Sequence, residues 1–429
     1  MKTTDVAVVG GGLGGLAVAA LLARGGRKVV LFEKARHLGG RAHTTHQEGY
    51  HLNLGPHALY LGGAAAGVLG RLGLPLKGNG PRGEGGFALR GGRLHTLPAG
   101  VVSLLTTDLL GAVGKLEFAR VLAGLNRVDA STLRGLSLEQ WLRAHVSRAE
   151  VRELVAMLFR VATYCADTEL MGADAAVAQL QMTLAGGVRY LDGGWGELVS
   201  GLTAVADAAG VERVLSARVV SVTREEGGER PRVRGVRLAD GTEWAADAVV
   251  VAGGPGDVAA LLPGDAVVAG WAARAVAVKA ASLEVGLTRL PRPRALVAFA
   301  VDRPWYAAVH SAWARLAPED GALVHVAKYL GAGDSEASEP ELERMLDVLQ
   351  PGWRMHVVTR RFLPGLTVMN ALPTPEGLGA RPRPVVEHVR GLAVVGDWVG
   401  SKGMLVDASL ASAEAVAHEW SGVGTARAA

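Results

Sequence analysis

The sequence predicts an α/β fold in which a Rossmann-type domain is interleaved with an α+β domain. At the amino end, the run DVAVVGGGLGGLAVAALLARGGRKVVLFEK has the pattern of a strand, a glycine turn, a helix and a second strand. Near the carboxyl end, a strand at residues 392–395 and a helix at about residues 407–417 repeat the start of that pattern. We therefore expect the chain to leave its first sheet, build a second domain, and return to complete the sheet.

Composition and charge exclude several classes of protein. With 429 residues and 49% apolar content, the chain is long enough for two domains. Its 45 basic residues are scattered rather than clustered, so nucleic acid is not an expected partner. Cys165 is the only cysteine, which excludes a disulfide framework within the chain and suits a reducing cytoplasm. The amino end has no secretory signal pattern, and we expect a cytoplasmic protein.

The amino-terminal glycines have the spacing of a dinucleotide-binding turn. Gly10 permits the tight turn after the strand, Gly12 allows backbone N–H groups to approach a pyrophosphate, and Gly15 allows the helix to pack closely on the strand. Glu33 ends the second strand about twenty residues later, where a carboxylate accepts hydrogen bonds from an adenosine ribose. An acidic residue at this position disfavours NADP and leaves NAD and FAD open.

The segment after Glu33 distinguishes between these two cofactors. In HLGGRAHTT, a second glycine pair precedes Arg41. Together with the first turn, this pattern resembles the flavin-dependent amine oxidase superfamily, which includes protoporphyrinogen oxidases and phytoene desaturases. The resemblance implies a GR2-like FAD-binding domain in which Arg41 contacts the phosphates or the flavin side, with a solvated surface arginine as the alternative. Cys165 is remote from the terminal flavin motif, so we expect the FAD to be non-covalent.

Further segments extend the resemblance through most of the chain. GYHLNLGPHAL, residues 49–59, is similar to the strand that runs to a Gly-Pro pair beside the isoalloxazine, with Asn53 where Asp is usual. GVRYLDGGWGELVSGL, residues 187–202, is similar to the family's glycine pair leading into a helix. Residues 211–251 alternate short β-rich runs with turn signals, which predicts hairpins. The resemblance implies that the backbone of Val219, in this meander, meets the adenine.

The carboxyl-terminal segment resembles the part of the family that closes the flavin site. The resemblance implies that Asp397 contacts the ribityl and pyrophosphate region and that residues 404–406 lie by the flavin pyrimidine ring at a helix N-terminus. A simple turn or cap aspartate is the alternative for Asp397. Asp407 and Ser412 stand where many members have glycine. The full set of residues expected around FAD is Gly10, Gly12, Leu13, Gly14, Gly15, Glu33, Lys34, Gly40, Arg41, Gly55, Pro56, His57, Val219, Gly253, Gly396, Asp397, Met404, Leu405 and Val406.

These patterns divide the chain into five segments. We expect the FAD-binding domain to comprise residues 1–80, 187–254 and 385–429. The substrate domain is then built from the two intervening segments, residues 81–186, mainly helical, and residues 255–384, in which strands alternate with loops and one helix begins at Ser338. Three pairs at capping-box spacing precede predicted helices in these segments, Ser137 with Gln140, Ser147 with Glu150, and Ser338 with Glu341.

A flavin held in this way accepts a hydride at N5, so the sequence predicts an FAD-dependent oxidoreductase. His57 follows Gly55 and Pro56 and is the best-placed ionisable side chain, as a base or an orienting group. A histidine that only packs beside the cofactor is the alternative. No metal site is expected.

The sequence is compatible with three functions. Members that oxidise small amines carry an aromatic residue where this chain has Met404, which indicates an incomplete amine cage. SAWARLAPEDGALVHVAKYL, residues 311–330, is similar to phytoene desaturase-like members and favours an apolar isoprenoid or polyene substrate. Trp305, Tyr306 and Met404 are candidates for its pocket, with core packing as the alternative for the two aromatic residues. The first function is therefore a desaturase or dehydrogenase of such a substrate. The second is an amine or protoporphyrinogen-type oxidase that uses O₂. The third is a non-catalytic relative that binds prenylated proteins.

The apolar run LPAGVVSLLTTDLLGAVG, residues 97–114, is too short to span a bilayer. It has few charges, and an apolar substrate would have to be collected from lipid, so we expect peripheral membrane contact through this segment. A core helix is the alternative for this segment.

Overall fold

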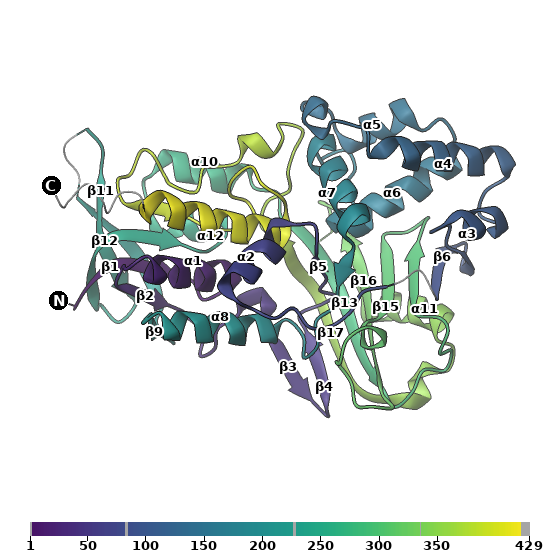
Figure 1. Ribbon diagram of the computed structural model, residues 1–429, viewed down its shortest axis with the longest axis horizontal. Coiled ribbons are helices and arrows are strands. Elements are labelled where there is room, and N and C mark those ends of the chain that lie inside the picture. The colour runs from purple at the N-terminus through teal and green to yellow at the C-terminus, as the bar shows by residue number, and fades with distance from the viewer. Residues whose placement is uncertain (1, 82–84, 226–228, 335, 422–429) are drawn as a thin grey trace.

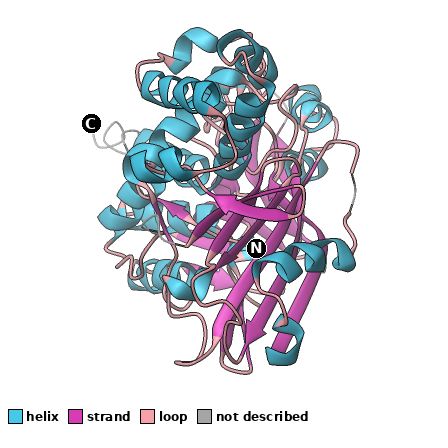
Figure 2. Ribbon diagram, turned by 90° about the vertical axis from the view of Figure 1, so that its right-hand side faces the viewer, coloured by secondary structure: helices cyan, strands magenta, loops and turns pink. Residues whose placement is uncertain are grey.

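The computed structural model describes residues 2–81, 85–225, 229–334 and 336–421, so the ends and three short stretches of the predicted segments lie outside it. The described residues form two domains that lie side by side (Figure 1). The first domain, at the left of Figure 1, contains both the amino-terminal strand and the last helix. The second domain, at the right, places a group of helices above a large sheet, as Figure 2 also shows.

The first domain is built on a seven-stranded sheet of order β10-β11-β12-β1-β2-β9, with β18 paired to β12. Strands β12, β1, β2, β9 and β18 are parallel, and β10, β11 and β12 form an antiparallel meander, which confirms the predicted hairpins. The returning strand ends one residue earlier than predicted. The strands are β1 (Lys2–Val9), β2 (Val29–Phe32), β9 (Glu212–Val214), β10 (Val219–Glu225), β11 (Arg232–Leu238), β12 (Glu243–Val251) and β18 (Leu392–Val394).

Helices cover both faces of this sheet because its central strands are apolar on both sides. In β1, Val6 and Val8 pack against one group of helices, and Ala7 packs in the core of the opposite face. The last helix lies beside the first, so the two ends of the chain form one layer (Figure 1). The first group comprises α1 (Leu13–Arg24), α2 (Ala64–Leu72), α8 (Gly196–Ala208) and α12 (Leu405–Ser421), and the second comprises α9 (Pro255–Leu261) and α10 (Ala266–Arg274).

The second domain contains a seven-stranded sheet of order β17-β13-β16-β15-β14-β6-β7. All its neighbouring strands are antiparallel except β14 and β6. Helix α11 (Glu339–Leu349) packs its apolar side on the sheet, while the other helices form a separate core. The strands are β6 (Gly86–Arg90), β7 (Arg93–Thr96), β13 (Val278–Leu287), β14 (Val297–Ala300), β15 (Trp305–Val309), β16 (Ala322–Leu330) and β17 (Val357–Met369), and the helices are α3 (Val101–Thr106), α4 (Ala112–Leu125), α5 (Leu138–His145), α6 (Ala149–Thr163) and α7 (Ala173–Gly186).

Two two-stranded sheets and five short 3₁₀ helices complete the part of the chain that the structure describes. One of the small sheets is a local hairpin, and the other pairs residues far apart in the chain. They consist of β3 (Thr44–Gln47) with β4 (Tyr50–Asn53), and β5 (Leu59–Tyr60) with β8 (Val188–Arg189). The 3₁₀ helices are η1 (Gly40–Ala42), η2 (Ala130–Leu133), η3 (His310–Ala312), η4 (Trp353–His356) and η5 (Leu378–Ala380).

The structure differs from the predicted segments in two places. Residues 255–274, expected as strands and loops of the substrate domain, form α9 and α10, whose buried side chains pack on the first sheet. Strands β6 and β7, in the segment expected to be mainly helical, instead extend the edge of the second sheet. In both cases the partner that buries the apolar face lies elsewhere in the sequence, so local periodicity did not reveal it.

Of the three predicted capping boxes, only the one between Ser137 and Gln140 forms as expected, at the start of α5. At α6 the N-cap is Arg148, and the carboxylate of Glu117 accepts hydrogen bonds from the backbone N–H groups of Ser147 and Arg148. A side chain from another helix thus replaces the predicted cap.

Helix α11 begins directly after Ser338, as predicted, but the Ser338 side chain makes no capping bond. The Glu341 carboxylate lies 3.1 Å from Lys328 Nζ instead. The Glu341 side chain is therefore engaged in an ion pair with Lys328 on β16 and does not form the predicted capping box. No helix in the described part of the chain is long and apolar enough to cross a membrane.

Candidate active site

A central cavity of about 860 Å³ lies between the two domains. Its lining includes the residues that directly follow β1, β2, β12 and β18, where parallel strands end and nucleotide ligands commonly bind. Every residue expected around FAD lines this cavity except Gly55 and Met404. The opposite wall comes from the second domain, with Tyr164, Ala280 and residues 363–368 of β17.

The three fingerprint glycines meet different surroundings. Gly10 has φ +109°, and a Cβ added there would lie 2.4 Å from the Ala252 carbonyl oxygen. A Cβ on Gly15 would lie 1.9 Å from the Gly10 carbonyl oxygen, so the helix can approach the strand only without a side chain. A Cβ on Gly12 would meet no atom within 4 Å, because this position faces the open cavity at the start of α1. The packing of the protein would thus allow a side chain at position 12, so it does not explain why Gly12 is a glycine.

Glu33 is held at the end of β2 by two backbone N–H groups. Gly11 N donates to Oε2 at 2.7 Å and Ala35 N donates to Oε1 at 2.8 Å, while the side chain is buried against the cavity. Each carboxylate oxygen has a further lone pair that can accept a hydroxyl proton. Lys34 and Val219 line the cavity beside it. The geometry therefore suits an acceptor for a ribose, as the sequence predicts.

Arg41 and Asp397, expected at opposite ends of the sequence pattern, form an ion pair with 2.7 Å between Arg41 Nη1 and Asp397 Oδ2. Arg41 Nη1 also donates to the Val368 carbonyl oxygen at 2.7 Å, which ties η1 to the second domain. The buried Asp397 accepts hydrogen bonds from both the backbone and the side chain of Asn370. Arg41 therefore has defined partners in both domains and is more than a solvated surface arginine.

The carboxyl-terminal helix α12 begins at the cavity, at Leu405 rather than at residue 407 as predicted. Leu405 has φ +53°, an unusual conformation for a leucine, and both Leu405 and Val406 line the cavity. The N-terminus of the helix carries partial positive charge, which suits an anionic group. Met404 is buried in the helical core of the second domain and does not reach the cavity lining.

The two positions that depart from glycine have clear partners. Asp407 is buried, and its Oδ1 accepts a hydrogen bond at 2.7 Å from Ala65 N, in the first turn of α2. Burial raises the pKa of Asp407 to about 6, against the lowering effect of that hydrogen bond. Ser412 Oγ accepts a hydrogen bond from Gly396 N at 3.2 Å. These side chains connect α12 to its neighbours and do not line the cavity.

His57 is held by its own turn and by an aromatic neighbour. Its Nδ1 lies 3.0 Å from the Gly55 carbonyl oxygen, and its ring centroid is 4.7 Å from that of Trp195. Since a carbonyl can only accept, Nδ1 carries the proton and Nε2 is left as the accepting nitrogen. Burial lowers the pKa of His57 below its usual value, and the Arg41 charge adds to this, while hydrogen bonds to the backbone of Gly55 and Arg41 oppose it; the net lowering favours a neutral imidazole. His57 is thus chemically able to accept a proton in the cavity.

Several lining residues were not predicted from the sequence. Tyr60 and Tyr164 bring two aromatic rings to the cavity, and Tyr164 is held with φ +60° at the end of α6. Residues 363–368, LPGLTV, supply most of the second-domain wall. The Pro-Gly pair lies within β17, where proline and glycine make a strand irregular, and only the folded sheet shows that this part faces the cavity.

Trp305 and Tyr306, the proposed pocket aromatics, lie outside the cavity lining. Trp305 is buried in the core under α11, and Tyr306 is buried with its hydroxyl 3.0 Å from His310 Nε2. Both therefore take the alternative role, core packing. Cys165 is also buried, and burial raises the pKa of its thiol to about 12.

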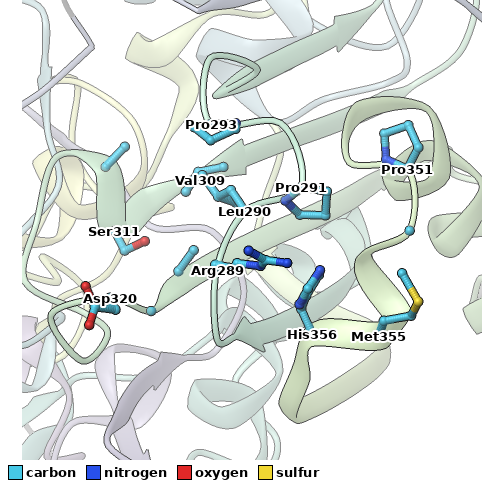
Figure 3. A pocket seen from close by; sticks show the side chains of 14 residues that line it. Arg289, Leu290, Pro291, Pro293, Val309, Ser311, Asp320, Pro351, Met355 and His356 are labelled. Carbon is cyan, nitrogen blue, oxygen red and sulfur yellow. The ribbon is translucent and has the colours of Figure 1, made fainter.

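A second hollow of about 730 Å³ lies on the second domain and shares no lining residue with the central cavity. Figure 3 shows Ser311 and Asp320 on one side of it and Met355 and His356 on the other. Among all the described residues, this hollow included, no group of three or more His, Cys, Asp or Glu residues is arranged to hold a metal ion.

Comparison with known proteins identifies the family. The model of the family described as flavin containing amine oxidoreductase matches residues 13–294, which is more than half of the chain. This chain belongs to that family. Membership implies a flavin cofactor, FAD, and the open space at Gly12, the carboxylate of Glu33 and the N-terminus of α12 fit such a group.

Individual relatives are distant and chemically diverse. A phytoene desaturase from Cercospora nicotianae is 29% identical over 283 residues, 58% of this chain and 45% of the relative. Polyamine oxidase 2 from Arabidopsis thaliana is 27% identical over 263 residues, 58% of this chain and 51% of the relative. The chain thus spans about half the length of these curated relatives.

A solved structure supports the same architecture along nearly the whole chain. The crystal structure of an oxidoreductase from Methanosarcina mazei superposes with a TM-score of 0.77 and 20% identity, covering 97% of this chain and all of that one. At this identity the likeness concerns the fold, and it matches the predicted combination of an FAD-binding and a substrate domain.

Proposed function

We propose that the protein is an FAD-dependent dehydrogenase or desaturase of an apolar, isoprenoid- or polyene-like molecule, with FAD held non-covalently. Bound FAD would accept a hydride at N5. The observation that carries the substrate class is the second-domain wall of the cavity, formed by Tyr164, Ala280 and residues 363–368, because none of these side chains carries a charge. Such a wall suits a hydrocarbon and would leave a charged group without compensation.

Non-covalent attachment is supported by the surroundings of Cys165. This thiol is buried among the helices of the second domain and does not line the cavity. Its Sγ contacts the Asp167 carbonyl oxygen at 3.6 Å, and its raised pKa keeps it as the unreactive thiol. Cofactor retention would then rest on the phosphate-binding turn, Glu33 and the pair of Arg41 with Asp397.

An amine substrate, which is protonated at neutral pH, would need a carboxylate in the cavity. The cavity carboxylates are already engaged, Glu33 by two backbone N–H groups and Asp397 by Arg41 and Asn370. The third, Asp257, accepts from Gly254 N at 2.9 Å. Tyr60 and Tyr164 supply aromatic rings, which favours the amine alternative, but aromatic rings without a free carboxylate bind a cation weakly. The apolar substrate class therefore fits better.

His57 would take the proton that a dehydrogenation releases. Its Nδ1 is fixed on Gly55, so a neutral ring presents Nε2 as the acceptor. A general base in the correct place speeds such a step by about 10²- to 10⁴-fold. The second domain would exclude water from the same space.

Anaerobic mixing tests the substrate class. We expect phytoene in detergent micelles to bleach the visible absorption band of the FAD-loaded protein, because the uncharged wall accommodates a hydrocarbon. Putrescine and spermidine should leave the band unchanged. Rapid bleaching by either amine, with none by phytoene, would contradict the proposal and favour the amine oxidase alternative. A protein that binds neither FAD nor substrate would instead favour the non-catalytic relative.

We also propose that the protein collects its substrate by peripheral contact with a membrane, through a patch formed by Val101, Val102 and Leu105 on α3 and Val113 and Leu116 on α4. These five side chains are 58–77% exposed. Lys115 Nζ donates to the Leu105 carbonyl oxygen at 2.7 Å, which joins the two helices and places a cation beside the apolar residues. Helix α3 has no buried residue, which favours surface contact over a core helix, although Leu109 and Leu110 of the same segment are buried in the helical core.

Liposome flotation tests this patch. We expect the wild-type protein to float with vesicles that contain phosphatidylglycerol, because apolar side chains and a nearby cation both favour an anionic lipid surface. Val101→Asp with Leu105→Asp should abolish flotation without lowering the melting temperature, since both side chains are exposed. Met355→Asp is the matched control, because it places a charge at another exposed apolar residue of the second domain, 83% exposed and outside the patch. This variant should float like the wild type. A wild-type protein that stays at the bottom of the gradient would contradict the proposal.

A further inference from the structure

A buried ion pair in the second domain reaches into the first. Glu284 on β13 and Arg361 on β17 are cross-strand partners, and Arg361 Nε donates to Glu284 Oε2 at 2.7 Å. Glu284 is fully buried, and neither side chain lines the central cavity. The pair therefore belongs to none of the contacts assigned above.

Both members of the pair also bind the segment that carries His57. Gly55 N donates to Glu284 Oε1 at 3.0 Å, and Arg361 Nη2 donates to the Asn53 carbonyl oxygen. Arg361 Nη1 further donates to Thr45 Oγ1 at 3.3 Å. The second domain thus forms hydrogen bonds to the β3–β4 hairpin and the turn after it at three residues, Thr45, Asn53 and Gly55.

The other side of the same segment is fixed by the first domain. The Asn53 side-chain oxygen accepts from Thr44 Oγ1 at 2.7 Å and from Trp195 N at 3.1 Å. Gly196 N donates to Thr44 Oγ1 at 2.8 Å. Residues 53–57 are therefore held between the two domains, with the His57 ring against Trp195.

A buried ion pair is a weak source of stability, because the cost of removing two charges from water often exceeds their attraction. Its presence here is better explained by the bonds it makes to backbone groups of residues 53 and 55. Another ionisable neighbour of Glu284 is His325 on β16, with Nδ1 3.4 Å from Glu284 Oε1. Burial lowers the pKa of His325 to about 3, so it is neutral and cannot replace Arg361 as the partner. Burial raises the pKa of Glu284 to about 7, and Arg361 opposes that rise.

We propose that Glu284 and Arg361 are positioning residues that set residues 53–57, and with them His57, against the bound flavin. The inference rests on the proposed function, because it requires FAD in the central cavity. The second domain would then influence the flavin through residues 53–57 as well as through the wall that faces the substrate.

Spectroscopy and potentiometry of the FAD-loaded protein test this inference. Glu284→Gln keeps an acceptor for Gly55 N but leaves the Arg361 charge unbalanced near the cavity. We expect FAD to stay bound and the reduced flavin to be favoured about tenfold, which raises the two-electron midpoint potential by about 30 mV. Glu284→Leu removes the acceptor as well and should change the flavin absorption spectrum and weaken FAD binding at least about tenfold.

The control is Asp265→Asn, which alters another buried carboxylate, paired with His388 at 3.0 Å and not part of the central cavity lining. It should lower the melting temperature and leave the flavin potential unchanged. If both Glu284 variants keep the wild-type spectrum and potential and only melt earlier, the pair merely stabilises the sheet and the inference is wrong. A wild-type protein that binds no FAD would overturn the proposed function, and this inference with it.

Discussion

Gly12→Ala is expected to weaken FAD binding by about 10- to 100-fold while the cofactor-free protein remains as stable as the wild type. The added methyl group meets no protein atom within 4 Å, so folding does not oppose it. It projects into the space that the pyrophosphate would take, and overpacking such a contact costs about 1–3 kcal/mol. Equilibrium titration with FAD and thermal melting of the cofactor-free protein measure the two effects separately.

Two variants serve as controls for this separation. Gly70→Ala, on the exposed side of α2 with no atom within 4 Å, should bind FAD normally and gain up to about 1 kcal/mol from helix propensity. Gly15→Ala should instead fail to fold properly, because its Cβ would lie 1.9 Å from the Gly10 carbonyl oxygen. Normal FAD affinity in the Gly12 variant would show that the cofactor does not approach this turn.

His57→Ala is expected to slow the anaerobic reduction of bound flavin by roughly 100-fold if the imidazole is the general base. The neutral ring is favoured by its lowered pKa, and the loss of Nε2 removes the proton acceptor. Stopped-flow absorbance with phytoene micelles gives the rate directly. FAD affinity should change much less than the rate, since the phosphate and ribose contacts lie elsewhere.

His57→Phe distinguishes chemistry from packing at the same position. A phenyl ring keeps the contact with Trp195 and lacks both nitrogens, so it should be as slow as the alanine variant. His418→Ala, at an exposed position on α12, should reduce at the wild-type rate. Recovery of the rate in His57→Phe would mean that the histidine only supports the cavity wall.

The parts of the site that the sequence predicts well are those defined by short, local patterns. The turn at Gly10 and Gly15 and the carboxylate of Glu33 lie within a single strand–helix–strand unit, whose geometry depends on neighbours in the chain. The pairing of Arg41 with Asp397 follows once both are placed at the same edge of one sheet. Such features need only a few residue types at fixed spacing.

The residues that the sequence did not reveal depend on contacts between distant segments. Tyr164 reaches the cavity because α6 ends in a left-handed residue at the domain boundary, and residues 363–368 do so through the pairing of β17 with β13. Met404 and Trp305 were expected near the substrate and are core residues instead, because hydrophobic residues at helix and strand positions pack wherever the tertiary fold buries them. Only the packing of the second domain distinguishes these roles.

Acid precipitation of the purified protein tests whether the cavity holds one FAD without a covalent link. After incubation with FAD and removal of the excess, we expect a yellow protein that releases about one FAD per chain into the acid supernatant and leaves a colourless pellet. A protein that remains colourless after incubation would show that the cavity does not bind FAD, and a pellet that retains the flavin would show a covalent link.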